Sequence, residues 1–258
     1  MSEIVVHAAA GILTLTIDRP DRKNALTQDM YGVMAAALES AATDDAVRVL
    51  VIQGSATLFT AGSDIGRFAE GQAAELPDPK SLQSFRFLCA LASFPKPVVA
   101  AVCGLAVGLG ATMLLHCEYV VAGDNASFLA PFVNMGLCPE AGSSLLAPQR
   151  LGYRHAVELL MMGEPLTAER ACAMGLVNRV VPHVDAQAIG QSVARRLAAK
   201  PLSSLVETKR LLKSGQSAAV VARILEEGEL FWQMMGRPAA REAIAALTEK
   251  RKPDFSRT

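Results

Sequence analysis

The sequence lacks the cysteine pattern of a disulfide framework or a zinc site. Its five cysteines are widely separated in apolar runs, and no two of them form a CxxC pair. These residues are Cys89, Cys103, Cys117, Cys138 and Cys172. Free cysteines are typical of a reducing compartment, so we expect a cytoplasmic protein. The first residues, MSEIVVHAAAG, lack a basic region followed by a long apolar stretch, so we expect no signal peptide.

An excess of charge of either sign is also missing, because Lys+Arg and Asp+Glu both count 25. This balance gives no reason to expect a nucleic-acid partner. The most apolar window, PVVAAVCGLAVGLGATMLL, approaches bilayer length, but its glycines and the polar HCEY that follows favour a buried strand, a loop and a buried helix. We therefore expect no membrane partner. From Lys200 onward the chain has 11 basic and 7 acidic residues, which charge alone would assign to a solvated tail.

Several catalytic and cofactor motifs are absent. The stretch GLGATM has Met113 where a dinucleotide fingerprint needs its third glycine, and no acidic residue follows a second strand about 20 residues later. There is no P-loop, no GxSxG and no HExxH. The histidines are scattered and are interpreted as structural or surface residues: His7, His116, His155 and His183. We expect neither a metal nor a separate cofactor.

What is present is a chain with 51% hydrophobic and 19% charged residues, enough to bury one large core. Strand patterns such as ILTLTID, VRVLVIQGS and KPVVAAV alternate with helical ones through about residue 180. The first long helix is predicted from about Thr27 to Ala42, and another near Ser81–Phe94. This alternation predicts an α/β core over residues 1–199. Helical patterns dominate from Lys200, so residues 200–258 are predicted to form a C-terminal helical region.

Two glycine-rich loops each follow a strand and precede a helix. TAGSD follows VRVLVIQ, and GLAVGLG follows PVVAAV. Such loops leave backbone N–H groups open, and a helix N-terminus adds positive potential. Either loop alone is typical of an ordinary tight turn. Two donors that converge on one point would form an oxyanion hole for the enolate of a thioester.

One carboxylate, Glu140, stands among small and apolar residues in NMGLCPEAGSSLL, with no cationic residue within nine positions on either side. It either faces water as a charge at a helix N-terminus or acts as a catalytic base. Burial against Phe132, Met135 and Leu137 should raise its pKa. Together with the two glycine loops, it favours catalysis on a carbonyl compound.

The order of these segments resembles the crotonase, or enoyl-CoA hydratase/isomerase, superfamily over nearly the whole chain. The segments are RPDRKNAL, LFTAGSDI, KPVVAAVCGLAVGLG, LAPFVNMGLCPEAGSSLLAPQRLG, GEPLTAERACAMGLVNRVV and EKRKPDF. The resemblance implies an α/β fold of the ClpP/crotonase type, a spiral of ββα repeats with a C-terminal helical trimerisation region. It also implies a homotrimer or a hexamer built as a dimer of trimers. The implied ligand is an acyl-CoA, whose coenzyme A enters as part of the substrate thioester.

The resemblance assigns roles to individual positions. The oxyanion donors would be the backbone N–H groups of Ser63 and Leu109. The residues implied in binding coenzyme A or the acyl group are Lys23, Ala61, Asp64, Ile65, Phe132, Phe231, Leu247 and Lys250. Lys250 would face the coenzyme A of a neighbouring subunit, which would give the basic tail a purpose. Acyl chain length would depend on the segment Ala69–Lys80 and on side chains near Phe85 and Phe132.

Departures from the family pattern indicate the reaction. Enoyl-CoA hydratases that resemble this chain carry two glutamates, where this sequence has Thr112 and Phe132. Hydration needs an acid and a base around one water, and neither residue can replace a carboxylate. Glu140 instead matches the single glutamate of peroxisomal-type Δ3,Δ2-enoyl-CoA isomerases. The hypothesis is therefore an isomerase of fatty-acid or related acyl-CoA metabolism, with a hydratase or another crotonase-type reaction, or a non-catalytic acyl-CoA-binding protein, as alternatives.

Overall fold

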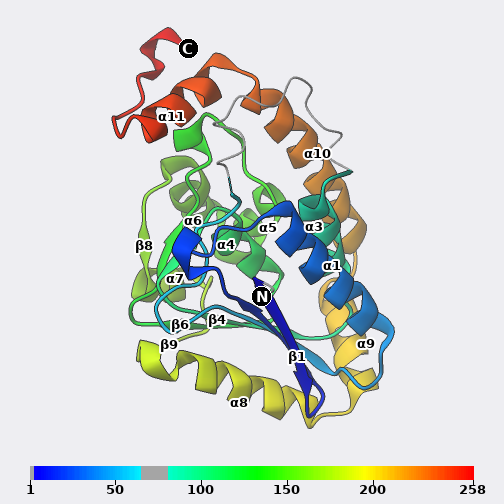
Figure 1. Ribbon diagram of the computed structural model, residues 1–258. Helices are drawn as coiled ribbons and strands as arrows, with labels where there is room; N and C mark the ends of the chain where they lie inside the picture. Colours follow the sequence, from blue (N-terminus) through cyan, green and yellow to red (C-terminus); the bar gives the residue numbers. More distant parts are fainter. Residues whose placement is uncertain (1–2, 65–80) are drawn as a thin grey trace.

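The computed structural model describes residues 3–64 and 81–258, which form two sheets surrounded by helices (Figure 1). The larger, six-stranded sheet has the order β1-β2-β3-β4-β6-β9. Its strands are β1 (Ile4–Ala9), β2 (Ile12–Ile17), β3 (Val49–Gln53), β4 (Val98–Val102), β6 (Tyr119–Gly123) and β9 (Arg179–Val181). Strands β1 and β2 form an antiparallel hairpin, and the other neighbours are parallel. The three-stranded sheet consists of β5 (Leu105–Val107), β7 (Ser127–Leu129) and β8 (Leu166–Thr167).

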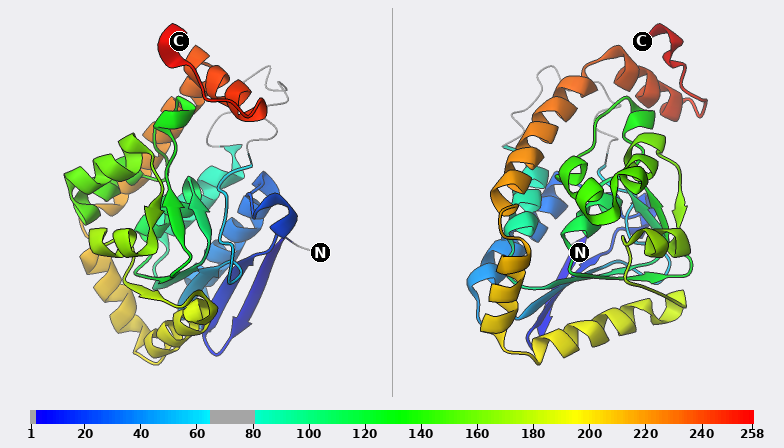
Figure 2. Two further views of the ribbon diagram at one scale, coloured as in Figure 1. Left: turned by 90° about the vertical axis from the view of Figure 1, so that its left-hand side faces the viewer. Right: turned by 180° about the vertical axis from the view of Figure 1, so that it is seen from behind.

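The larger sheet is covered on both faces, which explains its continuous apolar strands. Val49 and Val51 of β3 pack with Ala194 of α8 (Ala186–Ala198). The alternate residues of β3, Leu50 and Ile52, face the main core beneath α1 (Gln28–Thr43) and α3 (Gln83–Ser93). Figure 2 shows α8 (yellow) along one face of the sheet and α1 and α3 on the opposite side.

The other elements of the core are short. The helical segments that follow β5 along the chain are α4 (Leu109–Thr112), η3 (Met113–His116), η4 (Val133–Met135), α5 (Ser143–Leu151), α6 (Tyr153–Val157), η5 (Glu158–Met162) and α7 (Ala168–Met174). Single turns are formed by η1 (Pro20–Arg22), η6 (His183–Asp185) and η7 (Phe255–Arg257). The glycine loops and Glu140 lie among these short segments.

Most of the long predicted elements are present, and the second glycine loop differs from its prediction. The helix predicted from Thr27 is α1, and the Thr27 hydroxyl caps it by accepting the N–H of Met30 at 3.2 Å. GLAVGLG was predicted as a loop, but Leu105–Val107 within it forms strand β5. These residues pair in parallel with Ser127–Leu129 of β7, so tertiary pairing orders a segment whose glycines indicated a turn.

The C-terminal helices are α9 (Leu202–Leu212), α10 (Ser217–Met235) and α11 (Pro238–Thr248). Helix α10 packs along α3 and α5, and α11 packs against η4. The division of the chain at Lys200 remains a prediction. Within the described residues, no helix combines the length and the apolar composition needed to cross a membrane.

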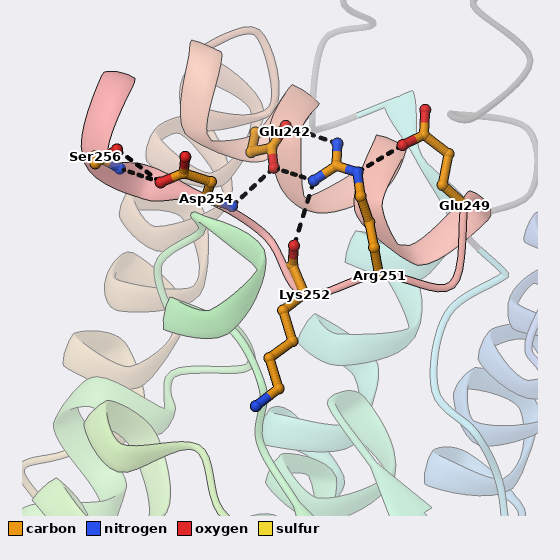
Figure 3. Close-up of polar contacts among 6 residues, drawn as sticks. All are labelled: Glu242, Glu249, Arg251, Lys252, Asp254 and Ser256. Atoms are coloured by element: carbon orange, nitrogen blue, oxygen red, sulfur yellow. Dashed lines mark hydrogen bonds and ion pairs between the residues drawn. The ribbon is translucent and has the colours of Figure 1, made fainter.

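The tail after α11 folds back onto that helix through one arginine (Figure 3). The Arg251 guanidinium forms ion pairs with Glu242 and with Glu249, the latter at 2.5 Å. Glu242 also accepts the backbone N–H of Asp254 at 2.8 Å. These contacts fix residues 249–254 against the end of α11.

Candidate active site

The two glycine loops lie side by side. The N–H of Thr60 donates to Leu105 O at 2.8 Å, and the N–H of Val107 donates to Thr60 O at 3.0 Å. Gly62 has a φ of +88°, and a Cβ at this position would lie 2.6 Å from Val107 O. Only glycine permits both this conformation and this approach. The sequence therefore brings TAGSD and GLAVGLG together at one place.

Among the described residues, each loop contains an open backbone donor. Leu26 forms a parallel bridge with Ser63, in which Leu26 N–H donates to Gly62 O and Asp64 N–H donates to Leu26 O. This pattern leaves the N–H of Ser63 outside the bridge. Leu109 is the first residue of α4, where N–H groups have no helical acceptor. Within residues 3–64 and 81–258, neither N–H has a hydrogen-bond acceptor.

Tyr31 of α1 connects the first loop to Glu140. Its hydroxyl oxygen lies 2.7 Å from Ser63 Oγ, and its side chain is fully buried. Burial, and then the nearby charge of Glu140, raise the pKa of Tyr31 above its ordinary value. Tyr31 is therefore in contact with Ser63 and within electrostatic reach of Glu140. Glu140 and Ser63 therefore both lie in the surroundings of Tyr31.

Glu140 lies in the turn between η4 and α5. Its carbonyl accepts the N–H of Ser143 at 3.1 Å, and the next two residues are left-handed, with φ of +65° at Ala141 and +68° at Gly142. His116 Nε2 donates to Ala141 O at 2.7 Å. Burial lowers the pKa of His116 to about 3, so the ring is neutral and its Nε2 carries the proton. This histidine is structural, in agreement with the sequence-based interpretation.

The Glu140 carboxyl combines access with desolvation. The residue is half-buried, and burial followed by the charge of Glu227 raises its pKa to about 7. A carboxyl that titrates near neutrality can both accept and return a proton. The raised pKa was expected from burial, whereas the contribution of Glu227 was not.

The two hydratase positions hold no proton-transfer group. Thr112 is fully buried, and its hydroxyl donates to Gly108 O at 3.2 Å within its own helix. Phe132 is also buried, with 5% of its surface exposed. An engaged hydroxyl and a hydrocarbon ring cannot activate water between them.

Three of the residues implied in coenzyme A binding are adjacent. Lys23 is left-handed and exposed, and its carbonyl accepts the N–H of Ala61 at 3.0 Å. The Asp64 carboxylate accepts a hydrogen bond from Arg19 at 2.8 Å. Ile65 and the segment Ala69–Lys80 lie outside the described residues. A role of Lys23, Ala61 and Asp64 toward coenzyme A stays a prediction.

The remaining implied residues lie on the C-terminal helices. Phe231 is half-buried on α10 and packs against the main core. Leu247, near the end of α11, has 56% of its surface exposed. Lys250 is exposed and left-handed, in the segment that Arg251 fixes (Figure 3). Their roles toward an acyl-CoA or a neighbouring subunit also stay predictions.

Two residues of this region were not found from the sequence. Tyr31 lies beside Met30 and Met34 on the buried side of α1, which is the pattern of a core residue. Glu227 lies in the run ILEEGELFW, where its neighbours Glu226 and Glu229 are exposed and a solvated helix face is the simplest interpretation. Neither position has a local signal, because their partners are distant in the sequence.

Comparison with known proteins identifies the family. The model of the family described as enoyl-CoA hydratase/isomerase matches residues 7–258. The chain belongs to the enoyl-CoA hydratase/isomerase family. The structure of Pseudomonas aeruginosa OdaA is similar, with a TM-score of 0.90 and 44% identity, over 96% of this chain and 99% of that one. The expected α/β crotonase fold is thereby confirmed.

Relatives of this chain are named for two different reactions, hydration and isomerisation. The chain is 35% identical to the 2,3-dehydroadipyl-CoA hydratase of Escherichia coli (strain K12) over 256 residues, 99% of each protein. It is also 35% identical to enoyl-CoA delta isomerase 2 of Rattus norvegicus over 226 residues, which are 87% of this chain and 58% of that protein. These similarities support an acyl-CoA enzyme and do not choose between hydration and isomerisation.

Proposed function

We propose that this protein is a Δ3,Δ2-enoyl-CoA isomerase that moves a carbon–carbon double bond with Glu140 as its single proton-transfer group. The observation that carries the proposal is the state of Glu140, a half-buried carboxyl whose pKa is raised to about 7 and whose charge influences Tyr31, the residue that contacts Ser63. Moving a double bond requires one group that removes and returns a proton. Adding water requires a second one.

The chemical steps follow from these groups. The Glu140 carboxylate removes a proton from C2 of a 3-enoyl-CoA, and the electron pair of that bond forms a dienolate. The N–H groups of Ser63 and Leu109 donate hydrogen bonds to the developing oxyanion. Glu140 then returns its proton to C4, which bonds it with the π electrons of C3=C4. The π electrons between C1 and C2 move to form the C2=C3 double bond, and the oxyanion re-forms the thioester carbonyl.

The two backbone donors and the base would each increase the rate of enolate formation. Each oxyanion donor contributes about 10²–10³ in rate when it is positioned before the reaction. A positioned base contributes about 10²–10⁴. Because both Gly62 and the Thr60–Leu105 pairing hold the loops in place, the donors need no rearrangement on substrate binding.

A hydratase remains the second candidate, since a relative that covers 99% of the chain carries that name. The purified protein should be incubated separately with trans-3-hexenoyl-CoA and with crotonyl-CoA. We expect conversion of the first to the trans-2-enoyl-CoA, and formation of 3-hydroxyacyl-CoA at least ~10²-fold slower, the scale of one missing proton-transfer group. Rapid hydration of crotonyl-CoA with no isomerisation of 3-hexenoyl-CoA would overturn the proposal.

Isotope exchange tests the single-base shuttle. In D₂O the product should contain deuterium at C4, diluted to the extent that Glu140 transfers the substrate's own C2 proton. A protein that binds acyl-CoA but turns over neither substrate would instead be a binding protein.

The proposal includes the assembly and the coenzyme A site implied by the family. We propose that Lys23, Ala61 and Asp64 contact the coenzyme A part of the substrate. In a homotrimer, or a hexamer made of two trimers, Lys250 would reach the ligand of a neighbouring subunit. The exposed position of Lys250, between Glu249 and Arg251 that form an ion pair, supports this arrangement. Sedimentation of the full chain measures the oligomeric state.

A further inference from the structure

A buried carboxylate, Glu227, lies beside the turn that carries the half-buried Glu140. It stands in the middle of α10, and 5% of its surface is exposed. One carboxylate oxygen accepts the N–H of Gly142 at 2.6 Å, and the other accepts the N–H of Ser144 at 2.9 Å. Gly142 is the N-cap of α5 and has no side chain, so Glu227 caps that helix from a different helix.

This cap also constrains the backbone next to Glu140. Ala141 is a non-glycine residue with a φ of +65°, a strained conformation that surrounding contacts must hold. His116 holds Ala141 O on one side, and Glu227 holds the N–H of Gly142 on the other. The conformation of the turn that carries Glu140 therefore depends on a residue 85 positions away from Gly142.

The charged and titratable groups around the turn leave Glu227 as the main electrostatic influence. Tyr31 of α1 and His116 of η3 are neutral, because burial shifts both pKa values away from ionisation. Burial likewise raises the pKa of the Cys138 thiol to about 11, within the same turn. On α10, Arg223 donates to Ser144 Oγ at 3.0 Å and to Glu226 at 2.8 Å.

Glu227 also removes an influence that would oppose catalysis. A helix N-terminus attracts negative charge and makes a nearby carboxylate less basic. Glu140 precedes the first residue of α5 by three positions, where it would otherwise receive this potential. Glu227 accepts N–H groups at the N-terminus of α5. Its negative charge therefore neutralises the positive potential of that terminus, so this potential does not lower the basicity of Glu140.

We propose that Glu227 is the positioning residue of Glu140: its carboxylate fixes the 140–144 turn, and its negative charge keeps Glu140 a strong base. The inference rests on the proposed function, because it explains how the base of that reaction is tuned. Glu227 acts through Glu140 and takes no part in proton transfer itself.

Two substitutions separate the charge from the geometry. Glu227→Gln keeps the length and removes the charge, so the acidic limb of the kcat/KM profile should move to lower pH by about one unit. Glu227→Asp keeps the charge but cannot reach both N–H groups, so kcat should fall while the limb keeps its wild-type midpoint. Glu229→Gln, an exposed carboxylate on the same helix, should change neither quantity.

A Glu227→Gln enzyme that loses activity but keeps the wild-type midpoint would overturn the electrostatic role and leave only a structural one. Glu227→Asp with unchanged kcat would overturn the positioning role. Circular dichroism and the oligomeric state establish that each variant is folded.

A measurement without turnover keeps the inference testable if Glu227→Gln fails to fold. In protein labelled with ¹³C at glutamate carboxyls, the titration midpoint of Glu227 should fall by about one pH unit in Glu140→Gln, because the interaction is reciprocal. An unchanged midpoint would overturn the inference.

This readout also distinguishes the two proposals. If Glu140→Gln remains fully active, the proposed function is wrong, whatever the titration shows. If Glu140→Gln is inactive but the Glu227 titration and the pH limb of Glu227→Gln are unchanged, the proposed function stands and the role of Glu227 is wrong.

Discussion

The hydroxyl of Tyr31 lies 2.7 Å from the hydroxyl of Ser63, and this contact joins helix α1 to the first glycine loop. Tyr31 is fully buried, and its ring also contacts Phe87 of α3 at a centroid distance of 5.8 Å. The residue whose N–H is proposed to bind the oxyanion is therefore held through its side chain by the core. This relationship makes Tyr31 a testable support of the oxyanion hole.

Replacing Tyr31 by Phe should retain the ring packing and remove one hydrogen bond. We expect a loss of about 1 kcal/mol in the free energy of unfolding, and a kcat that falls several-fold because the Ser63 loop is less firmly held. Thermal unfolding and steady-state kinetics measure the two effects. Tyr119→Phe, on β6, serves as the control. An additive loss in the Tyr31→Phe, Ser63→Ala double variant would contradict the coupling, because both changes break the same contact.

Replacing Glu140 by Gln should reduce turnover by at least ~10²-fold while acyl-CoA binding and the oligomer are retained. The same change should stabilise the protein in alkaline solution. The pKa of Glu140 is raised in the folded state, so the folded protein binds more protons than the unfolded one between about pH 4.5 and 7, and stability falls as the pH rises through this range. Thermal unfolding at pH 8 should therefore show a higher Tm for Glu140→Gln. Activity within a few-fold of wild type would show that Glu140 is structural.

Ser63 should act through its backbone. Ser63→Ala keeps the N–H and should be mild, whereas Ser63→Pro removes the donor and should abolish turnover. Initial rates on the same acyl-CoA, with the oligomer checked for each variant, make the comparison. Equal inactivity of the two folded variants would refute the assignment of the N–H group.

The pH dependence of turnover should report Glu140. Only its ionised form removes a proton, so kcat/KM should rise with pH through a midpoint near 7, where the pKa of Glu140 lies, and not near the ordinary value of a glutamate. Profiles measured at constant ionic strength provide the test. A midpoint close to pH 4.5 would show that the carboxyl is not desolvated in solution.

Stability in acid should depend on His116. Its pKa is about 3 when buried and about 6.5 when unfolded, so the unfolded chain binds the extra proton between these values. The contribution of neutral His116 to the free energy of unfolding is fully present above pH 6.5, and it is lost as the pH falls toward 3. His116→Gln retains a donor for Ala141 O without this titration, and its unfolding free energy should decline less steeply between pH 6.5 and 4. Parallel curves for the two proteins would contradict this account.

Long, strongly patterned elements were predictable from the sequence. Helix α1 and strands β3 and β4 each have a capping or turn signal in the sequence. Each also has the apolar pattern that a buried element requires. The short strands were not. β1 is not among the predicted strands, and five of its six residues are exposed; β5 exists because it pairs with β7. Pairing between distant segments decides such strands more than local preference does.

The candidate site divides in the same way. Glu140 and the two glycine loops were recognisable, because glycine spacing and an isolated carboxylate are local features of the sequence. Tyr31 and Glu227 were not, since 32 residues separate Tyr31 from Ser63 and 85 separate Glu227 from Gly142. A buried side chain on another helix produces no recognisable pattern in the sequence of the segment that it contacts.

The cap that Glu227 places on α5 also has a consequence for the order of folding. Helix α10 comes late in the chain, so the turn that carries Glu140 cannot reach its final conformation until that helix has docked. Contacts between such distant residues form slowly, because the intervening chain must first be closed into a loop. During refolding the circular dichroism signal of the helices should therefore return before enzymatic activity does. The recovery of activity would then mark the time at which the tertiary structure is complete.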